Sequence, residues 1–189
     1  MPIITRRFPL TARGSFSLVA GAVFCIAAAS PDSARLPEDC SMLVETGQTV
    51  CVDRGEDLDA AVLARTGRVV VETSLDDPST SKAATSPLSL ADSQYVLGYV
   101  YDDIDFGGDS FRFTTWDSAL CSPGKRYGTS SLRSIGWNDR LSSFSGRNGC
   151  LGTIFMDDDY SGGSFGPVGS AAWVGDSFND KASSIQWAR

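Results

Sequence analysis

A seven-residue pattern occurs twice in the last third of this sequence and constrains the fold more than any other feature. WNDRLSS (137–143) and FNDKASS (178–184) both consist of an aromatic residue, Asn-Asp, two variable residues and Ser-Ser. A second pair precedes them: YDDIDFGG (101–108) and FMDDDYSG (155–162) share an aromatic residue, four residues, another aromatic, one residue and glycine. Two motifs in the same order, each present twice, indicate an internal structural repeat.

The two repeat units differ in length. The aromatic elements are offset by 54 residues, from Tyr101 to Phe155, and the Asn-Asp elements by 41, from Asn138 to Asn179. The first unit therefore carries 13 extra residues between its two motifs. We place this insertion around CSPGKRYGTSSLR (121–133).

The composition from Tyr95 onward is typical of an antiparallel all-β domain. Short apolar alternations such as YVLGYVY (95–101) and LGTIFM (151–156) are separated by turn residues, and helical periodicity is absent. The two aromatic residues of each upstream motif can stack if the hairpin between them folds back over the sheet. Such a hairpin needs a residue that tolerates positive φ, which explains the glycine.

The first 29 residues resemble an export signal. Three arginines (Arg6, Arg7 and Arg13) precede an apolar run, 16–29, that is too short to span a bilayer. We expect residues 1–29 to be a signal peptide, and we expect the mature protein to be secreted and extracellular.

Residues 30–93 show a different organisation. TVCVD (49–53) and RVVVET (68–73) have strand patterns, and EDLDAAVLARTG (56–67) has helical spacing. We expect 30–72 to form a small N-terminal appendage or propeptide, 73–93 to form a polar linker, and 94–189 to form the main domain, which should fold without the preceding segments.

Cysteine usage agrees with an oxidising compartment. Without Cys25 of the signal region, four cysteines remain, and three pairings are possible. We favour Cys40–Cys51 and Cys121–Cys150, because each pair falls within one compositionally uniform stretch. Metal-thiolate binding is the competing reading, but no Cys-x-x-Cys spacing supports it.

Charge and composition exclude several classes of function. Removal of the signal takes three of the 16 basic residues and none of the 23 acidic ones, which leaves a net charge near −10. This charge disfavours nucleic acid and anionic membranes as partners and suits a protein that binds cations. The sequence has no histidine and no nucleophile motif, so we expect a protein that is not an enzyme.

The repeated Asn-Asp-x-x-Ser-Ser element offers hard oxygen ligands in duplicate. Taken singly, Asn, Asp and Ser are ordinary turn residues. Taken as a pair, Asp139 and Asp180 supply carboxylates, and Ser142 and Ser183 supply hydroxyls. Ca²⁺ accepts six to eight such oxygens, whereas softer metals prefer the sulfur or imidazole that are missing here.

The paired aromatic-glycine and Asn-Asp-x-x-Ser-Ser elements resemble the two Greek-key motifs of a microbial calcium-binding βγ-crystallin domain over residues 95–189. The resemblance implies two Greek keys in one β-sandwich that holds two Ca²⁺ ions. One site would use Asp139, the carbonyls of Arg140 and Met156, and Ser183; its twin would use Asp180, the carbonyls of Lys181 and Asp102, and Ser142. Which hairpin serves which site stays open, and we expect Asn138 and Asn179 to brace the loops.

We therefore expect a secreted, monomeric Ca²⁺-binding protein that Ca²⁺ stabilises. The alternative, on the same fold, is a metalloproteinase inhibitor or killer-toxin-like protein. An inhibitor would present the disulfide-tied insertion between Gly108 and Asn138 to a secreted protease. Calcium ions are the expected partners in the first case, and neither alternative involves nucleic acid or a membrane.

Overall fold

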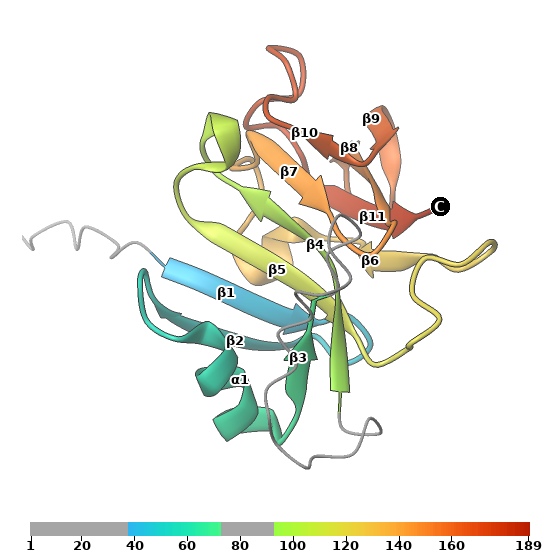
Figure 1. Cartoon of the computed structure of the whole chain (residues 1–189). Helices are drawn as coiled ribbons and strands as arrows, with labels where there is room; N and C mark the ends of the chain where they lie inside the picture. Colours follow the sequence, from blue (N-terminus) through green and yellow to red (C-terminus); the bar gives the residue numbers. More distant parts are fainter. Residues whose placement is uncertain (1–37, 73–92) are drawn as a thin grey trace, which may run out of the picture. The chain divides into compact units, whose positions relative to one another are not determined.

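The computed structural model describes residues 38–72 and 93–189 (Figure 1). The predicted signal peptide (1–29) and nearly all of the predicted linker (73–93) lie outside these residues. Within the described ranges, no helix is long and apolar enough to cross a membrane. The elements in chain order are β1 (Glu38–Leu43), β2 (Gln48–Asp53), α1 (Leu58–Thr66), β3 (Val69–Val71), β4 (Ser93–Tyr101), β5 (Ser110–Thr115), β6 (Tyr127–Thr129), β7 (Ser143–Gly146), β8 (Leu151–Asp157), β9 (Ser161–Val168), β10 (Ser170–Ala171) and β11 (Ser184–Ala188).

The strands form two sheets that exchange strands between the sequence repeats. One sheet has the order β10-β7-β4-β5-β1-β2, with β3 beside β4, and the other has the order β6-β11-β8-β9. Strand β6 comes from the first repeat but pairs with β11 of the second, and β10 comes from the second repeat but pairs with β7 of the first. Each repeat is thus a Greek key, and the predicted all-β fold class is confirmed.

Aromatic side chains fill the core of the domain. Phe113 and Phe144 both lie 6.1 Å, centroid to centroid, from the ring of Trp187, which is fully buried. Two glycines allow this approach, because a Cβ atom on Gly98 would lie 2.5 Å from the Trp187 ring and one on Gly152 would lie 2.6 Å from the Phe144 ring. These close contacts explain two glycines in strand interiors, where glycine otherwise weakens pairing.

The N-terminal segment is part of the first sheet, which differs from the separate appendage expected from the sequence. Strand β1 pairs in parallel with β5, so that Cys40 lies opposite Phe111 and Met42 opposite Phe113. Strand β3 pairs in parallel with β4. Both Cys40 and Met42 are buried in the same core cluster as the aromatic residues. The physical reason is that β5 would otherwise leave an unpaired edge, and β1 satisfies its backbone groups.

The local predictions for this segment are confirmed by β2, α1 and β3, whereas β1 was not expected. Helix α1 begins at an Asp57 cap, whose carboxylate accepts from the backbone N–H of Ala60 at 2.9 Å, and ends at Gly67 with φ 70°. Within the first sheet, the buried Arg112 of β5 pairs with Asp59 of this helix at 2.6 Å. Helix and hairpin are therefore joined to the domain by both backbone and side-chain contacts.

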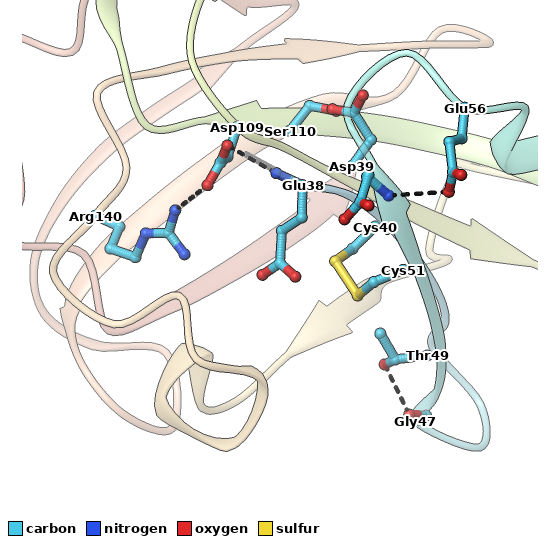
Figure 2. The surroundings of a disulfide bond; sticks show 11 residues. Glu38, Asp39, Cys40, Gly47, Thr49, Cys51, Glu56, Asp109, Ser110 and Arg140 are labelled. Carbon is cyan, nitrogen blue, oxygen red and sulfur yellow. Dashed lines mark hydrogen bonds and ion pairs between the residues drawn. A yellow bond between two sulfur atoms is a disulfide. The ribbon is translucent and has the colours of Figure 1, made fainter. Parts of the chain in front are cut away.

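Both favoured disulfides are present. Cys40–Cys51 links β1 to β2, with an S–S distance of 2.07 Å, and Cys121–Cys150 links the insertion to the residue before β8, at 2.03 Å. The first bridge closes a cross-strand hairpin, as Figure 2 shows. The second fixes the start of the insertion against the junction between the two repeats.

Candidate metal centre formed by the duplicated loops

The two aromatic-glycine motifs form the same folded hairpin. Tyr101 and Phe106 meet edge-to-face at 5.7 Å, and Phe155 and Tyr160 meet in the same way at 5.9 Å. In both hairpins the second aromatic residue and the glycine two positions later have positive φ, with 75° at Gly108 and at Gly162. The predicted folding-back is confirmed, and the two rings meet by edge and face rather than in parallel.

The second serine of each Ser-Ser pair holds its own hairpin. The Ser143 hydroxyl donates to the Asp103 carbonyl at 2.6 Å and accepts from the Phe106 N–H at 3.1 Å. The Ser184 hydroxyl donates to the Asp157 carbonyl at 2.7 Å and accepts from the Tyr160 N–H at 3.1 Å. Each hydroxyl donates its proton and accepts one hydrogen bond within its own hairpin, so Ser143 and Ser184 have a structural role there.

The first serine of each pair lies between its own hairpin and the loop of the other repeat. The backbone N–H of Ser142 donates to the Tyr101 carbonyl at 2.9 Å, and its hydroxyl donates to the Asp180 carboxylate at 3.3 Å. The backbone N–H of Ser183 donates to the Phe155 carbonyl at 2.8 Å. Asp102 follows Tyr101 directly, so this geometry groups Asp102 with Ser142 and Asp180.

Backbone bonds cross between the two Asn-Asp loops. The N–H of Asp139 donates to the Ala182 carbonyl and the N–H of Asp180 donates to the Leu141 carbonyl, both at 3.1 Å. Asp139 therefore lies beside Ser183, just as Asp180 lies beside Ser142. Since the Ser183 N–H is hydrogen-bonded to the Phe155 carbonyl, Met156 falls into the group of Asp139, Arg140 and Ser183. Lys181 follows Asp180 directly and belongs to the first group.

The Asn-Asp pairs have the same conformation in both loops. Asp139 and Asp180 have φ of 56° and 54°, and their side chains are exposed. Asn138 donates to the Asp139 carboxylate and Asn179 donates to the Asp180 carboxylate, at 2.5 and 2.7 Å. The side-chain oxygens of both asparagines are buried and have no hydrogen-bond partner within 38–72 and 93–189. Buried polar atoms are seldom left unpaired, so two equivalent unpaired oxygens beside two carboxylates fit a pair of sites that take a cation.

Strand exchange between the repeats, the two folded aromatic hairpins and the crossed Asn-Asp loops together define the architecture. Residues 93–189 have a βγ-crystallin fold.

Comparisons with known proteins give the following neighbours. No family model and no curated protein matches the chain. Among solved structures, a βγ-crystallin domain from Clostridium beijerinckii is 24% identical and covers 49% of this chain and 97% of its own, with a TM-score of 0.38. A βγ-crystallin domain from Flavobacterium johnsoniae is 26% identical and covers 48% of this chain and 92% of its own, with a TM-score of 0.36. The N-terminal domain of protein S is 23% identical and covers 48% and 93%, with a TM-score of 0.37.

The basic residues that follow Asn-Asp in the two loops, Arg140 and Lys181, make different contacts. Arg140 bridges the carboxylates of Asp102 and Asp109, at 2.8 and 2.9 Å, and its guanidinium lies 4.5 Å from the centre of the Trp137 ring. Lys181 instead donates to the carbonyls of its own loop, at Asp176 (2.9 Å) and Ser177 (3.4 Å). The Asp102 hairpin thus has a neutralising arginine, whereas Met156 at the equivalent position carries no carboxylate.

Sequence reasoning missed Asp109, which links this loop to the N-terminal segment. Its carboxylate accepts from the Glu38 backbone N–H at 3.0 Å and from Arg140 at 2.9 Å (Figure 2). It also accepts from Arg54 at 2.7 Å. In the sequence, its position directly after Gly108 was the one feature that could have indicated this role. Figure 2 also shows Glu38 near the Cys40–Cys51 bridge; the two sulfurs are bonded to each other, so this group is not a thiolate site.

Proposed function

We propose that this protein is a secreted, non-enzymatic Ca²⁺-binding βγ-crystallin domain protein that binds two ions per domain and is stabilised by them. The observation that carries the proposal is the crossed pairing of the loops, in which Ser142 of one repeat contacts Asp180 of the other. Secretion is supported by the signal-like residues 1–29 and by two disulfides, which persist in oxidising compartments.

The donor chemistry of the two groups fits Ca²⁺. One group offers the Asp180 carboxylate, the Ser142 hydroxyl and the carbonyls of Lys181 and Asp102. The other offers the Asp139 carboxylate, the Ser183 hydroxyl and the carbonyls of Arg140 and Met156. Every one of these donors is a hard oxygen, and water completes the six to eight ligands that Ca²⁺ accepts.

Calcium should stabilise the fold because each set of ligands comes from two repeats. The serines are buried, at 4% exposure for Ser142 and 8% for Ser183, and meet the opposite loop only in the folded chain. A ligand that binds only the native state contributes about 2.7 kcal/mol per site at 100 times its dissociation constant.

Isothermal titration of the EDTA-treated mature protein tests the proposal. We expect about two Ca²⁺ per chain, and we expect Asp139→Asn and Asp180→Asn each to reduce the stoichiometry to about one. Asp158→Asn is the matched control, because Asp158 is an exposed hairpin acid outside the ligand set. Absence of heat and of any melting shift at millimolar Ca²⁺ would contradict the proposal, as would an equal loss in the control.

The contacts of the insertion do not favour the inhibitor alternative. The N–H groups of Leu120, Ser122 and Lys125 donate to the carbonyls three residues earlier, at 2.9 to 3.2 Å. These bonds form consecutive turns, whereas a segment that adds to a protease cleft as a strand needs free backbone groups. We therefore keep calcium binding as the proposed function.

A further inference from the structure

An open groove of about 520 Å³ lies beside the insertion. Its lining comes from four places: Glu45 in the turn after β1, Trp116 and Asp117 after β5, Tyr127 in β6 with Gln186 in β11, and Tyr160 in the second aromatic hairpin. The volume lies within the about 300–1,000 Å³ that small-molecule sites usually occupy. None of these residues belongs to the proposed calcium ligands, so the groove would be a separate site.

Aromatic rings form the apolar part of the groove. Trp116 is 47% exposed and is one of four large hydrophobic side chains that the structure shows as exposed in 38–72 and 93–189. The Arg68 guanidinium lies 5.6 Å from its ring centre and steadies the indole. Tyr127 and Tyr160 add two partly buried rings. An exposed indole held in place beside two phenol rings suits a flat apolar ligand face.

Fixed polar groups surround these rings. The Asp117 carboxylate accepts from Lys125 at 2.8 Å, from the Ala119 N–H at 2.9 Å and from the Tyr127 hydroxyl at 2.9 Å. These hydrogen bonds, that from Lys125 above all, lower the pKa of Asp117 to about 2 and keep it ionised at neutral pH. Arg126 donates to the Gln186 side chain at 2.8 Å. The groove therefore presents hydrogen-bond donors and acceptors whose positions are fixed by contacts within the protein.

The groove carries little net charge. Among the lining residues, Glu45 and Asp117 are negative and Arg126 is positive. Lys125, which is not part of the lining, pairs with Asp117 at 2.8 Å, so neither an anion nor a cation is favoured. A pyranose ring matches this surface, because its C–H face is apolar and its edges carry hydroxyl donors and acceptors. We propose that this groove binds a short, neutral oligosaccharide.

Calorimetric titration with cellotriose, maltotriose and chitotriose tests this proposal. We expect saturable binding of at least one of these probes to the full mature protein, weakened at least tenfold by Trp116→Ala. Trp173→Ala is the matched control, because Trp173 is 52% exposed but does not line the groove. Thermal melting of both variants verifies that they are folded.

Three results would overturn the proposal: no binding of any probe at about 10 mM, equal binding by the Trp116 variant and the wild type, or tighter binding of a sulfated chondroitin disaccharide than of the neutral probes. Each titration is run in Ca²⁺ and in EDTA. Sugar binding that persists in EDTA supports the groove even if the calcium proposal fails. Calcium binding without any sugar binding contradicts the groove proposal and leaves the calcium proposal standing.

Discussion

Replacing Met42 by alanine tests whether the N-terminal strands belong to the core of the crystallin domain. Met42 lies in β1 opposite Phe113, and only 3% of its surface is exposed. Truncation of a buried methionine to alanine costs about 2–5 kcal/mol, because transfer energy is lost and a cavity remains. We expect about 3 kcal/mol, which for a domain of this size lowers the melting temperature by roughly 6–12 °C.

Tryptophan fluorescence provides the assay, because all four tryptophans lie after residue 93 and Trp137 and Trp187 are buried. The signal therefore reports unfolding of the crystallin domain and not of the N-terminal segment itself. Gln48→Ala is the control, since Gln48 is exposed on the same hairpin and should leave the melting curve unchanged. If Met42→Ala leaves the fluorescence-detected melting temperature at the wild-type value, the N-terminal strands are a separate appendage after all.

Three further predictions follow from the same contacts. A chain that begins at Ser93 should melt lower or aggregate even in Ca²⁺, because it exposes the edge of β5; light scattering and circular dichroism measure this. Replacing Cys121 and Cys150 by serine should cost about 3–4 kcal/mol in a urea titration, given the separation of 29 residues. The pKa of Asp117 falls from 3.8 to about 2 on folding, so its stabilising contribution is present above pH 4 and lost towards pH 2. Urea midpoints of Asp117→Asn should therefore fall less between pH 4 and 2 than those of the wild type.

Much of the fold could be predicted because its signals are local or repeated. Helix α1 has an Asp cap before its apolar spacing and a glycine after it, and the hairpins carry their glycine at the position that needs positive φ. Strand β1 gave no such signal: in EDCSML, Ser41, Met42 and Leu43 are all buried, so the alternation that marks a half-exposed strand is missing. Its parallel pairing with β5 joins residues about seventy positions apart, which no local pattern reports.

The residues of the candidate metal site could be predicted in part, again because their signal is repeated. The repeat identified Asp139, Asp180 and the two first serines, because duplication singles out residues that one copy leaves among ordinary turn chemistry. The roles of Arg140 and Asp109 could not be predicted, since they depend on side-chain contacts across 31 positions of the sequence. The sequence places a basic residue in each loop, Arg140 and Lys181, and the structure shows these two residues in different surroundings.

The calcium dependence of melting in two serine variants tests the central claim most directly. Ser142→Ala and Ser183→Ala each remove one hydroxyl without adding bulk, and Ser142→Arg and Ser183→Arg place a cation in the same positions. We expect each single variant to lose about half of the Ca²⁺-dependent rise in melting temperature, and the double variants to lose nearly all of it. Loss of the whole rise in either single alanine variant, or an undiminished rise in both arginine variants, would contradict the account of two separate sites with ligands crossed between the repeats.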